Sequence, residues 1–102
     1  MSETIYEKQG TTLTVKPQGR LDTATSPVLE KELEQHLDGV KDVIMDFSSV
    51  EYISSGGLRM LLATEQLLEA RDGHMKVEHA NEYIIEVFDM VGFMDVVEVV
   101  TD

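Results

Sequence analysis

The sequence predicts a single α/β domain in which helices pack against a mixed β-sheet. Apolar residues follow strand-like spacing in some segments and helix-like spacing in others, and the two kinds of segment alternate along the chain. The 102 residues, 42% of them hydrophobic, suffice for one modest core. No repeat, low-complexity tract or Pro/Gly/Ser-rich linker divides the chain, so we expect one domain over residues 1–102.

The chain is expected to open with a β-hairpin. Apolar residues alternate with polar ones on either side of a Gln-Gly turn signal at residues 9–10. Pro17 and Gly19 then end or bend the second strand. An amphipathic helix follows, with Ser26 as its N-cap, Pro27 at its first helical position and leucines recurring at helical spacing.

The rest of the chain predicts strand, helix, strand, helix and strand. Residues 40–47 form an almost continuous apolar run, which is typical of a central parallel strand covered on both faces. Parallel neighbours imply right-handed crossover connections. The remaining elements are expected in this order: a helix from about Gly56 or Gly57 to Ala70, a short strand at residues 75–77, a helix capped by Asn81, and a strand at residues 96–100.

The charge and residue composition exclude several classes of protein. Asp plus Glu number 20 against 8 for Lys plus Arg, and the formal charge of −12 repels nucleic acid and anionic membranes. We therefore expect a protein partner and contact with neither of these. The absence of cysteine excludes disulfides and a thiol nucleophile. The N-terminus lacks a signal peptide and no apolar run is long enough to span a membrane, so a cytoplasmic protein is expected.

Catalytic, nucleotide and metal sites find little support in the sequence. Neither a P-loop nor a G-x-G-x-x-G motif occurs, so we do not expect the chain itself to bind ATP. Ser54 or Ser55 could be combined with His36, His74 or His79 into a hydrolase triad, but the turn lacks the G-x-S-x-G pattern. No histidine pair has the i, i+4 spacing of a helical metal site, so neither a metal centre, a cofactor nor enzymatic activity is expected.

The most informative segment is DFSSVEYISSGGLRMLL, residues 46–62, which joins an apolar strand to an apolar-striped helix. The first N–H groups of a helix lack intrahelical partners and lie at the positive end of the helix dipole, so a phosphate is stabilised there. Two interpretations are open: Ser54 or Ser55 caps the helix, or one of them accepts a phosphoryl group. They are compatible, because a serine that caps the helix could also be phosphorylated. Met60 lies off the leucine stripe and is the methionine that we expect to be exposed.

Residues 46–62 resemble the signature of STAS domains, specifically of bacterial anti-sigma factor antagonists. GRLDTATSP and IIEVFDMVGFMDVVEV resemble further segments of that family, so the resemblance spans nearly the whole chain. It implies a four- to five-stranded mixed sheet with helices on one side. It also implies a function: the unphosphorylated protein binds a serine-kinase anti-sigma factor and frees a sigma factor, phosphorylation of one serine by that kinase ends binding, and a metal-dependent serine phosphatase restores the active form.

The resemblance also assigns roles to individual residues. Alignment on the Gly-Leu pair at residues 57–58 places Ser55 at the phosphoacceptor position. Ser54 then stands where the family usually has aspartate, and Gly56 stands where the family has a second hydroxyl residue. Because Ser54 is a serine adjacent to Ser55, it is the alternative acceptor. Asp22 matches an acidic residue of the family close to the turn. The expected partner-binding surface consists of Asp22, Thr23, Ser54, Ser55, Gly56, Gly57, Arg59 and Met60.

One alternative from another functional class stays open. The chain could be a non-switching STAS-like scaffold or a ligand-sensing interaction module, with its serines acting only as helix caps. The cytoplasmic domain of an anion transporter would need membrane spans, which the sequence lacks. We expect the resting chain to be a monomer.

Overall fold

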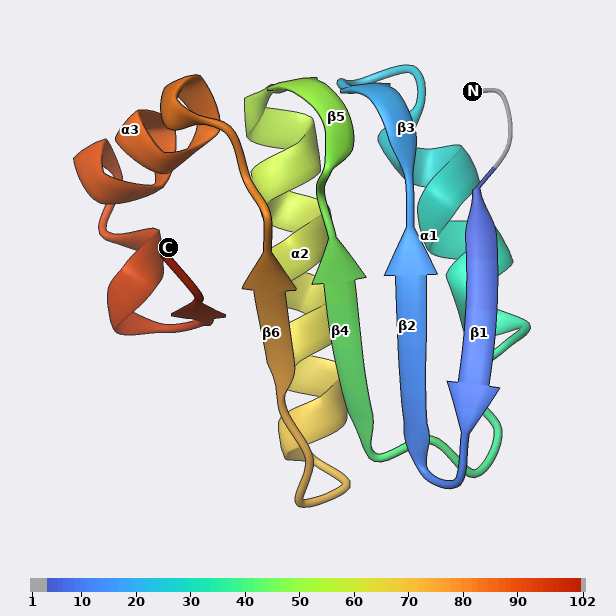
Figure 1. Cartoon of the computed structure of the whole chain (residues 1–102). Coiled ribbons are helices and arrows are strands. Elements are labelled where there is room, and N and C mark those ends of the chain that lie inside the picture. Colours follow the sequence, from blue (N-terminus) through green and yellow to red (C-terminus); the bar gives the residue numbers. More distant parts are fainter. Residues whose placement is uncertain (1–3, 102) are drawn as a thin grey trace.

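The computed structural model describes residues 4–101, and it contains a five-stranded sheet, a two-stranded sheet and three α-helices (Figure 1). This is the α/β architecture that the sequence predicts. In chain order the elements are β1 (Ile5–Gln9), β2 (Thr12–Lys16), β3 (Gln18–Leu21), α1 (Ser26–Glu34), β4 (Asp42–Asp46), β5 (Ser49–Ile53), α2 (Ser55–Glu69), β6 (Met75–Glu78), α3 (Glu82–Met90), the 3-10 helix η1 (Phe93–Asp95) and β7 (Glu98–Val99).

The main sheet has the strand order β1-β2-β4-β6-β7, and the hairpin of β1 and β2 is its antiparallel part. The pairs β2–β4, β4–β6 and β6–β7 are parallel. The second sheet pairs β3 with β5 in parallel and extends the direction of β2 and β4 (Figure 1). Neither β3 nor β5 is among the elements predicted from the sequence. Pro17 separates β3 from β2, and the pairing shifts by one position between Gly19 and Arg20.

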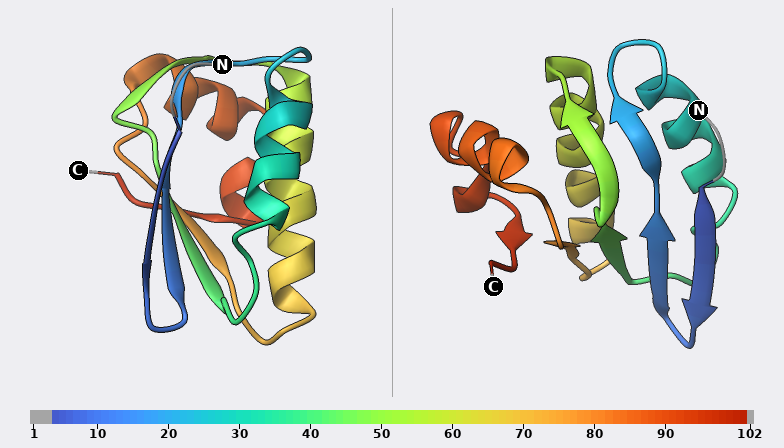
Figure 2. Two further views of the ribbon diagram at one scale, coloured as in Figure 1. Left: turned by 90° about the vertical axis from the view of Figure 1, so that its right-hand side faces the viewer. Right: turned by 45° about the horizontal axis from the view of Figure 1, so that its top comes forward.

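Helices α1 and α2 lie side by side on one face of the sheet, and α3 lies at the end of the sheet formed by β6 and β7 and packs against β5 and η1 (Figures 1 and 2). In the central strand β4, Val43 and Met45 are buried whereas Ile44 between them is half-buried. The expectation that this strand is covered on both faces is therefore wrong. Its apolar run is unbroken because the β-branched Ile44 stands on the face that carries no helix.

Two helix starts differ from the sequence expectation by one or two residues. Ser26 is the first residue of α1 rather than its cap, and the N-cap Thr25 makes no side-chain cap bond. The Asp22 carboxylate instead accepts the N–H groups of Ala24 and Thr25 ahead of the helix, each at 3.0 Å. Helix α2 begins at Ser55.

The C-terminal segment is more irregular than the strand expected at residues 96–100. Only Glu98–Val99 pair with β6, and η1 precedes them. The rings of Phe88 and Phe93 stack with centroids 4.3 Å apart, so η1 packs against α3. No helix of the part described is both long and apolar enough to cross a membrane.

Candidate functional site

The two serines at the junction between β5 and α2 differ in their hydrogen bonds and exposure. The backbone of Ser54 is extended, its Oγ accepts the N–H of Gly56 at 3.2 Å, and its own N–H donates to the carbonyl of Leu21 at 2.8 Å. Ser54 is therefore the N-cap of α2 and is tied to β3. Ser55 is the first helical residue, its side chain is exposed, and its hydroxyl makes no hydrogen bond within residues 4–101.

The glycine that follows lets α2 approach the strands closely. A Cβ on Gly57 would lie 2.7 Å from Cγ1 of Ile53 and 2.8 Å from the carbonyl oxygen of Leu21, so a side chain has no room there. A Cβ on Gly56 would meet Cα of Thr23 at 3.2 Å, a tight contact with an exposed loop. The two glycines thus place Ser55 directly beside the loop that connects β3 to α1.

That neighbouring loop is held by Asp22 and Thr25. The Thr25 hydroxyl accepts the N–H of Asp22 at 2.9 Å and donates to the carbonyl of Arg20 at 2.6 Å. The N–H of Thr25, with smaller contributions from that of Ala24 and from the Arg20 guanidinium, holds the pKa of Asp22 below its usual range. Asp22 thus presents a negative charge near the turn, and Thr23 beside it is exposed.

Three residues that were not predicted from the sequence extend from Asp22 along the second sheet to α3: Arg20, Tyr52 and Tyr83. The Arg20 guanidinium lies 4.1 Å above the ring of Tyr52 and 3.7 Å from the Asp22 carboxylate. The Tyr52 ring stacks on Tyr83 of α3, with centroids 5.9 Å apart. Alternation along residues 49–53 could have placed Tyr52 on the outer face, but its contacts come from strands and helices distant in sequence.

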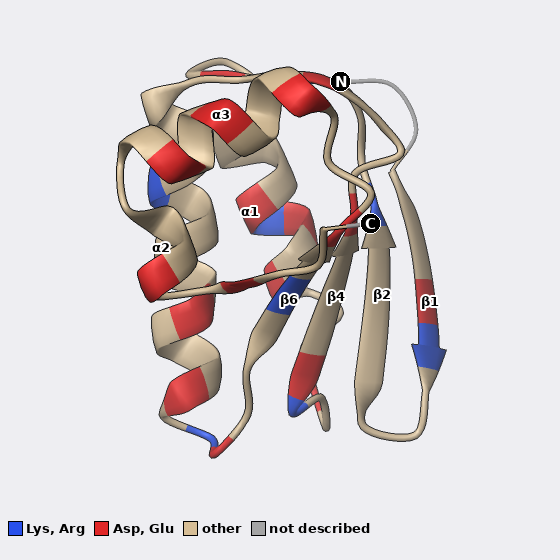
Figure 3. Cartoon of the chain, turned by 60° about the vertical axis from the view of Figure 1, so that its left-hand side comes forward, with Lys and Arg blue, Asp and Glu red and all other residues tan. Residues whose placement is uncertain are grey.

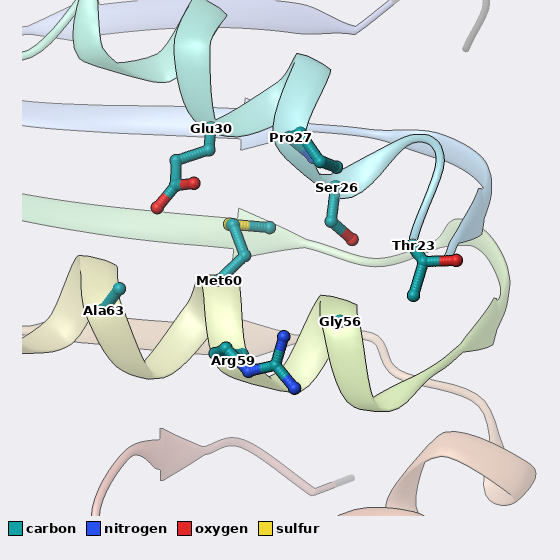
Figure 4. A pocket seen from close by; sticks show the side chains of 8 residues that line it. All are labelled: Thr23, Ser26, Pro27, Glu30, Gly56, Arg59, Met60 and Ala63. Atoms are coloured by element: carbon teal, nitrogen blue, oxygen red, sulfur yellow. The ribbon is translucent and has the colours of Figure 1, made fainter.

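Two cavities flank the first turns of α2, and Arg59 lines both. One of about 270 Å³ lies between α1 and α2 (Figure 4). Met60 forms part of its wall and is only 4% exposed, so the expectation of an exposed Met60 is wrong: α1 covers that side of the helix. The other cavity, of about 310 Å³, lies between α2 and the segment after α3, and its lining is mostly apolar: Ser55, Leu58, Arg59, Leu62, Val91, Gly92, Phe93 and Val96.

The predicted site residues therefore gather around one end of α2, but two of the three histidines contact other parts of the molecule. His36 stacks on the ring of Tyr6 in β1, and Nδ1 of His74 lies 3.1 Å from the Glu65 carboxylate near the far end of α2. Neither imidazole is in place to activate Ser54 or Ser55 as a nucleophile. The exposed hydroxyl of Ser55 therefore contacts neither of these two imidazoles.

Comparisons with known proteins point to one family. The model of the STAS domain family matches residues 3–102. The anti-sigma-B factor antagonist of Staphylococcus epidermidis is 33% identical over 83% of this chain and 80% of its own. That of Bacillus subtilis is 27% identical over 79% of this chain and 74% of its own.

Solved structures of the anti-sigma factor antagonist SpoIIAA share the fold. Its unphosphorylated form has a TM-score of 0.76 at 16% identity, covering 98% of this chain and 89% of its own. The phosphorylated form, from Bacillus, has a TM-score of 0.74 at 18% identity, covering 98% of this chain and 93% of its own. At this identity the likeness concerns the arrangement of strands and helices.

Proposed function

The chain belongs to the STAS domain family of anti-sigma factor antagonists, and we propose that its unphosphorylated form binds a serine-kinase anti-sigma factor and so frees a sigma factor. Phosphorylation of Ser55 by that kinase ends the contact, and a metal-dependent serine phosphatase restores it. The chain itself performs no catalysis in this cycle. We further propose that it acts in the cytoplasm as a monomer.

One observation carries the choice of acceptor: the hydroxyl of Ser55 is exposed and unbonded, whereas that of Ser54 is engaged as the helix cap. Transfer to Ser54 would use an oxygen that already accepts the Gly56 N–H, and it would disturb a cap worth about 1 kcal/mol. Transfer to Ser55 disturbs no hydrogen bond of the described part of the chain. This supports Ser55 as the acceptor and keeps Ser54 as the alternative.

The transfer needs only positioning from this chain. The Ser55 oxygen forms a bond to the γ-phosphorus of ATP held by the kinase, the bond from that phosphorus to the bridging oxygen breaks, and ADP leaves. A base of the kinase takes the hydroxyl proton. The product is stabilised at the positive end of the α2 dipole, so the turn keeps its conformation.

Loss of binding then follows from charge and desolvation. The phosphate adds about two negative charges at a surface that already carries Asp22. Figure 3 shows further acidic residues along α2 and α3. A kinase surface that fits the neutral hydroxyl has to desolvate this dianion, and its own bound nucleotide phosphates repel it.

The test incubates this chain with a serine-kinase anti-sigma factor, ATP and Mg²⁺, and uses mass spectrometry to locate the phosphate. We expect modification of wild type and Ser54→Ala and none of Ser55→Ala. Phosphate on Ser54 alone would overturn the choice of acceptor, and phosphate on neither serine would overturn the switch itself.

Binding measurements by calorimetry complete the test. Ser55→Ala should bind the anti-sigma factor whether or not ATP is present, and Ser55→Asp should bind at least tenfold more weakly than wild type. Ser49→Asp is the matched control, because it adds the same charge to an exposed residue at the other end of β5. Equal binding of Ser55→Asp and wild type would favour a non-switching module.

The cavity between α1 and α2 favours the ligand-sensing module as the second candidate function. It adjoins the turn at Gly56, and Arg59 and the buried Ser26 line it. In that case filling the cavity, as in Ala63→Leu, would change partner binding while Ser55→Asp would not. If phosphorylation controls binding, the two variants should show the opposite pattern.

A further inference from the structure

The far end of α2 carries a second cluster of functional groups, remote from Ser55. Glu65 and Glu69 lie one helical turn apart on the same side of the helix, and His74 precedes β6, which runs beside α2 (Figure 1). One ligand atom from each of these three side chains lies within 4.8 Å of the other two. At a rise of 1.5 Å per residue, Glu65 is about 15 Å along the helix from Ser55.

Two of the three groups are held in place by backbone contacts. Oε1 of Glu65 accepts the N–H of Met75 at 2.7 Å, and its Oε2 lies 3.1 Å from Nδ1 of His74. The N–H of His74 in turn donates to the Asp42 carboxylate at 3.0 Å. Such outer contacts orient metal ligands in known sites, and here they hold a carboxylate oxygen and an imidazole nitrogen 3.1 Å apart.

The surroundings of Glu65 are compatible with a bound cation. Its residue is only 2% exposed, and a buried carboxylate is costly unless it is paired. Within residues 4–101 its only ion-pair partner is His74, and Arg71 is occupied by the carbonyls of Leu37 and Val40. Glu69 adds a second carboxylate at the negative end of the helix dipole, where the last turn of α2 holds no basic residue.

We propose that Glu65, Glu69 and His74 bind a divalent transition-metal ion of the Zn²⁺ type. With bonds of about 2.0–2.1 Å, two ligand atoms of a tetrahedral site lie about 3.3–3.4 Å apart, close to the observed 3.1 Å between Glu65 Oε2 and His74 Nδ1. Glu69 is exposed and closes the third bond by a change of rotamer. Water completes the coordination, and the imidazole favours Zn²⁺ over Mg²⁺ or Ca²⁺.

The bound ion would join the end of α2 to the strands beneath it. Glu69 belongs to the helix, whereas His74 is anchored through Asp42 to β4 and directly precedes β6. Because only the folded chain brings these groups together, binding should stabilise the fold, by an amount that rises with the logarithm of the free ion concentration above the dissociation constant. This role does not depend on phosphorylation, so the proposal stands or falls separately from the proposed function.

The test titrates Zn²⁺ into the metal-free full chain against a chromophoric chelator, with Co²⁺ absorbance as a spectroscopic signature of the same site. We expect one ion per chain, and at least tenfold weaker binding by Glu69→Gln and by His74→Gln. Both changed side chains are exposed, so the variants should fold, and circular dichroism checks that they do.

Matched controls are Glu86→Gln on α3, an exposed glutamate, and His36→Gln, which removes an imidazole that stacks on Tyr6. Both should bind Zn²⁺ as wild type does. The proposal is overturned if wild type binds no stoichiometric ion, or if Glu69→Gln and His74→Gln keep the wild-type affinity. The second result would place any bound ion elsewhere, and the Glu65–His74 contact would then be an ordinary hydrogen bond.

Discussion

Exchanging Gly57 for alanine should destabilise the domain, although alanine is the better helix former. The new Cβ would lie 2.7 Å from Ile53 and 2.8 Å from the Leu21 carbonyl oxygen. That oxygen is fixed, because it also accepts the N–H of Ser54. Overpacking of this kind costs about 1–3 kcal/mol, and the gain in helix propensity offsets at most about 1 kcal/mol. Because two contacts are shorter than 3.0 Å, the overpacking cost should lie in the upper part of that range, at about 2–3 kcal/mol, and we expect a net loss of about 1–2 kcal/mol.

The neighbouring glycine supplies the control for this prediction. A Cβ on Gly56 would be 3.2 Å from Thr23, whose exposed loop can yield by a few tenths of an ångström. The stability of Gly56→Ala should therefore stay within about 0.5 kcal/mol of wild type. Alanine loses less backbone entropy on folding than glycine does, and this gain offsets the cost of the contact.

Urea denaturation followed by circular dichroism measures the stability of both variants. In a thermal scan the Tm of Gly57→Ala should lie below that of wild type by about 4–8 °C for each kcal/mol of lost stability. If Gly57→Ala proved as stable as Gly56→Ala, the close approach of α2 to β3 and β5 would not constrain this position. A second readout is the kinase reaction, in which displacement of the helix start should slow transfer to Ser55 in Gly57→Ala alone.

Three other substitutions test separate parts of the structure. Asn81→Ala removes the cap that accepts the Ile84 N–H at 2.8 Å and should cost about 1 kcal/mol in urea denaturation; an unchanged midpoint would contradict this role. Leu68→Ala empties a site with 0% exposure and should cost about 2–5 kcal/mol by the same assay, whereas a cost under about 1 kcal/mol would mean that the site collapses. The folded-state pKa of Asp22 is lowered, chiefly by the N–H of Thr25, so its stabilisation is present above the unfolded-state pKa and is lost as pH falls through the folded-state value. The urea midpoint of Asp22→Asn should therefore fall less than that of wild type between about pH 5 and pH 2, and parallel curves would refute this.

The element order could be predicted from the sequence because most elements carry a clear apolar period. The leucines of α1 and α2 recur at helical spacing, and the caps Ser54 and Asn81 match known start signals. Strands β3 and β5 were not resolved because Gln18–Leu21 is short and mostly polar and Ser49–Ile53 is read as part of the turn region. Their pairing depends on each other, which local spacing does not reveal.

The site was predictable where it is local and unpredictable where it is assembled across the fold. Ser55 and the glycines after it are consecutive residues of one junction, so the local motif is enough to predict where they lie. Burial of Met60 depends on where α1 crosses α2, and a periodic pattern on one helix does not contain that crossing. The contact of Glu65 with His74 was likewise hidden, because a search for paired histidines on one helix misses a ligand that precedes the next strand.

The hydrogen bonds of Ser54 have a kinetic consequence for partner exchange. Its side chain and both its backbone groups are bonded, so the segment that presents Ser55 needs no ordering before a partner arrives. Encounter should then proceed at the roughly 10⁵–10⁷ M⁻¹s⁻¹ typical of preformed surfaces. Under the proposed function, stopped-flow measurements should show that a phosphorylated chain differs from an unmodified one mainly in its residence time on the anti-sigma factor. That residence time, more than the rate of capture, would then set how quickly a sigma factor is returned.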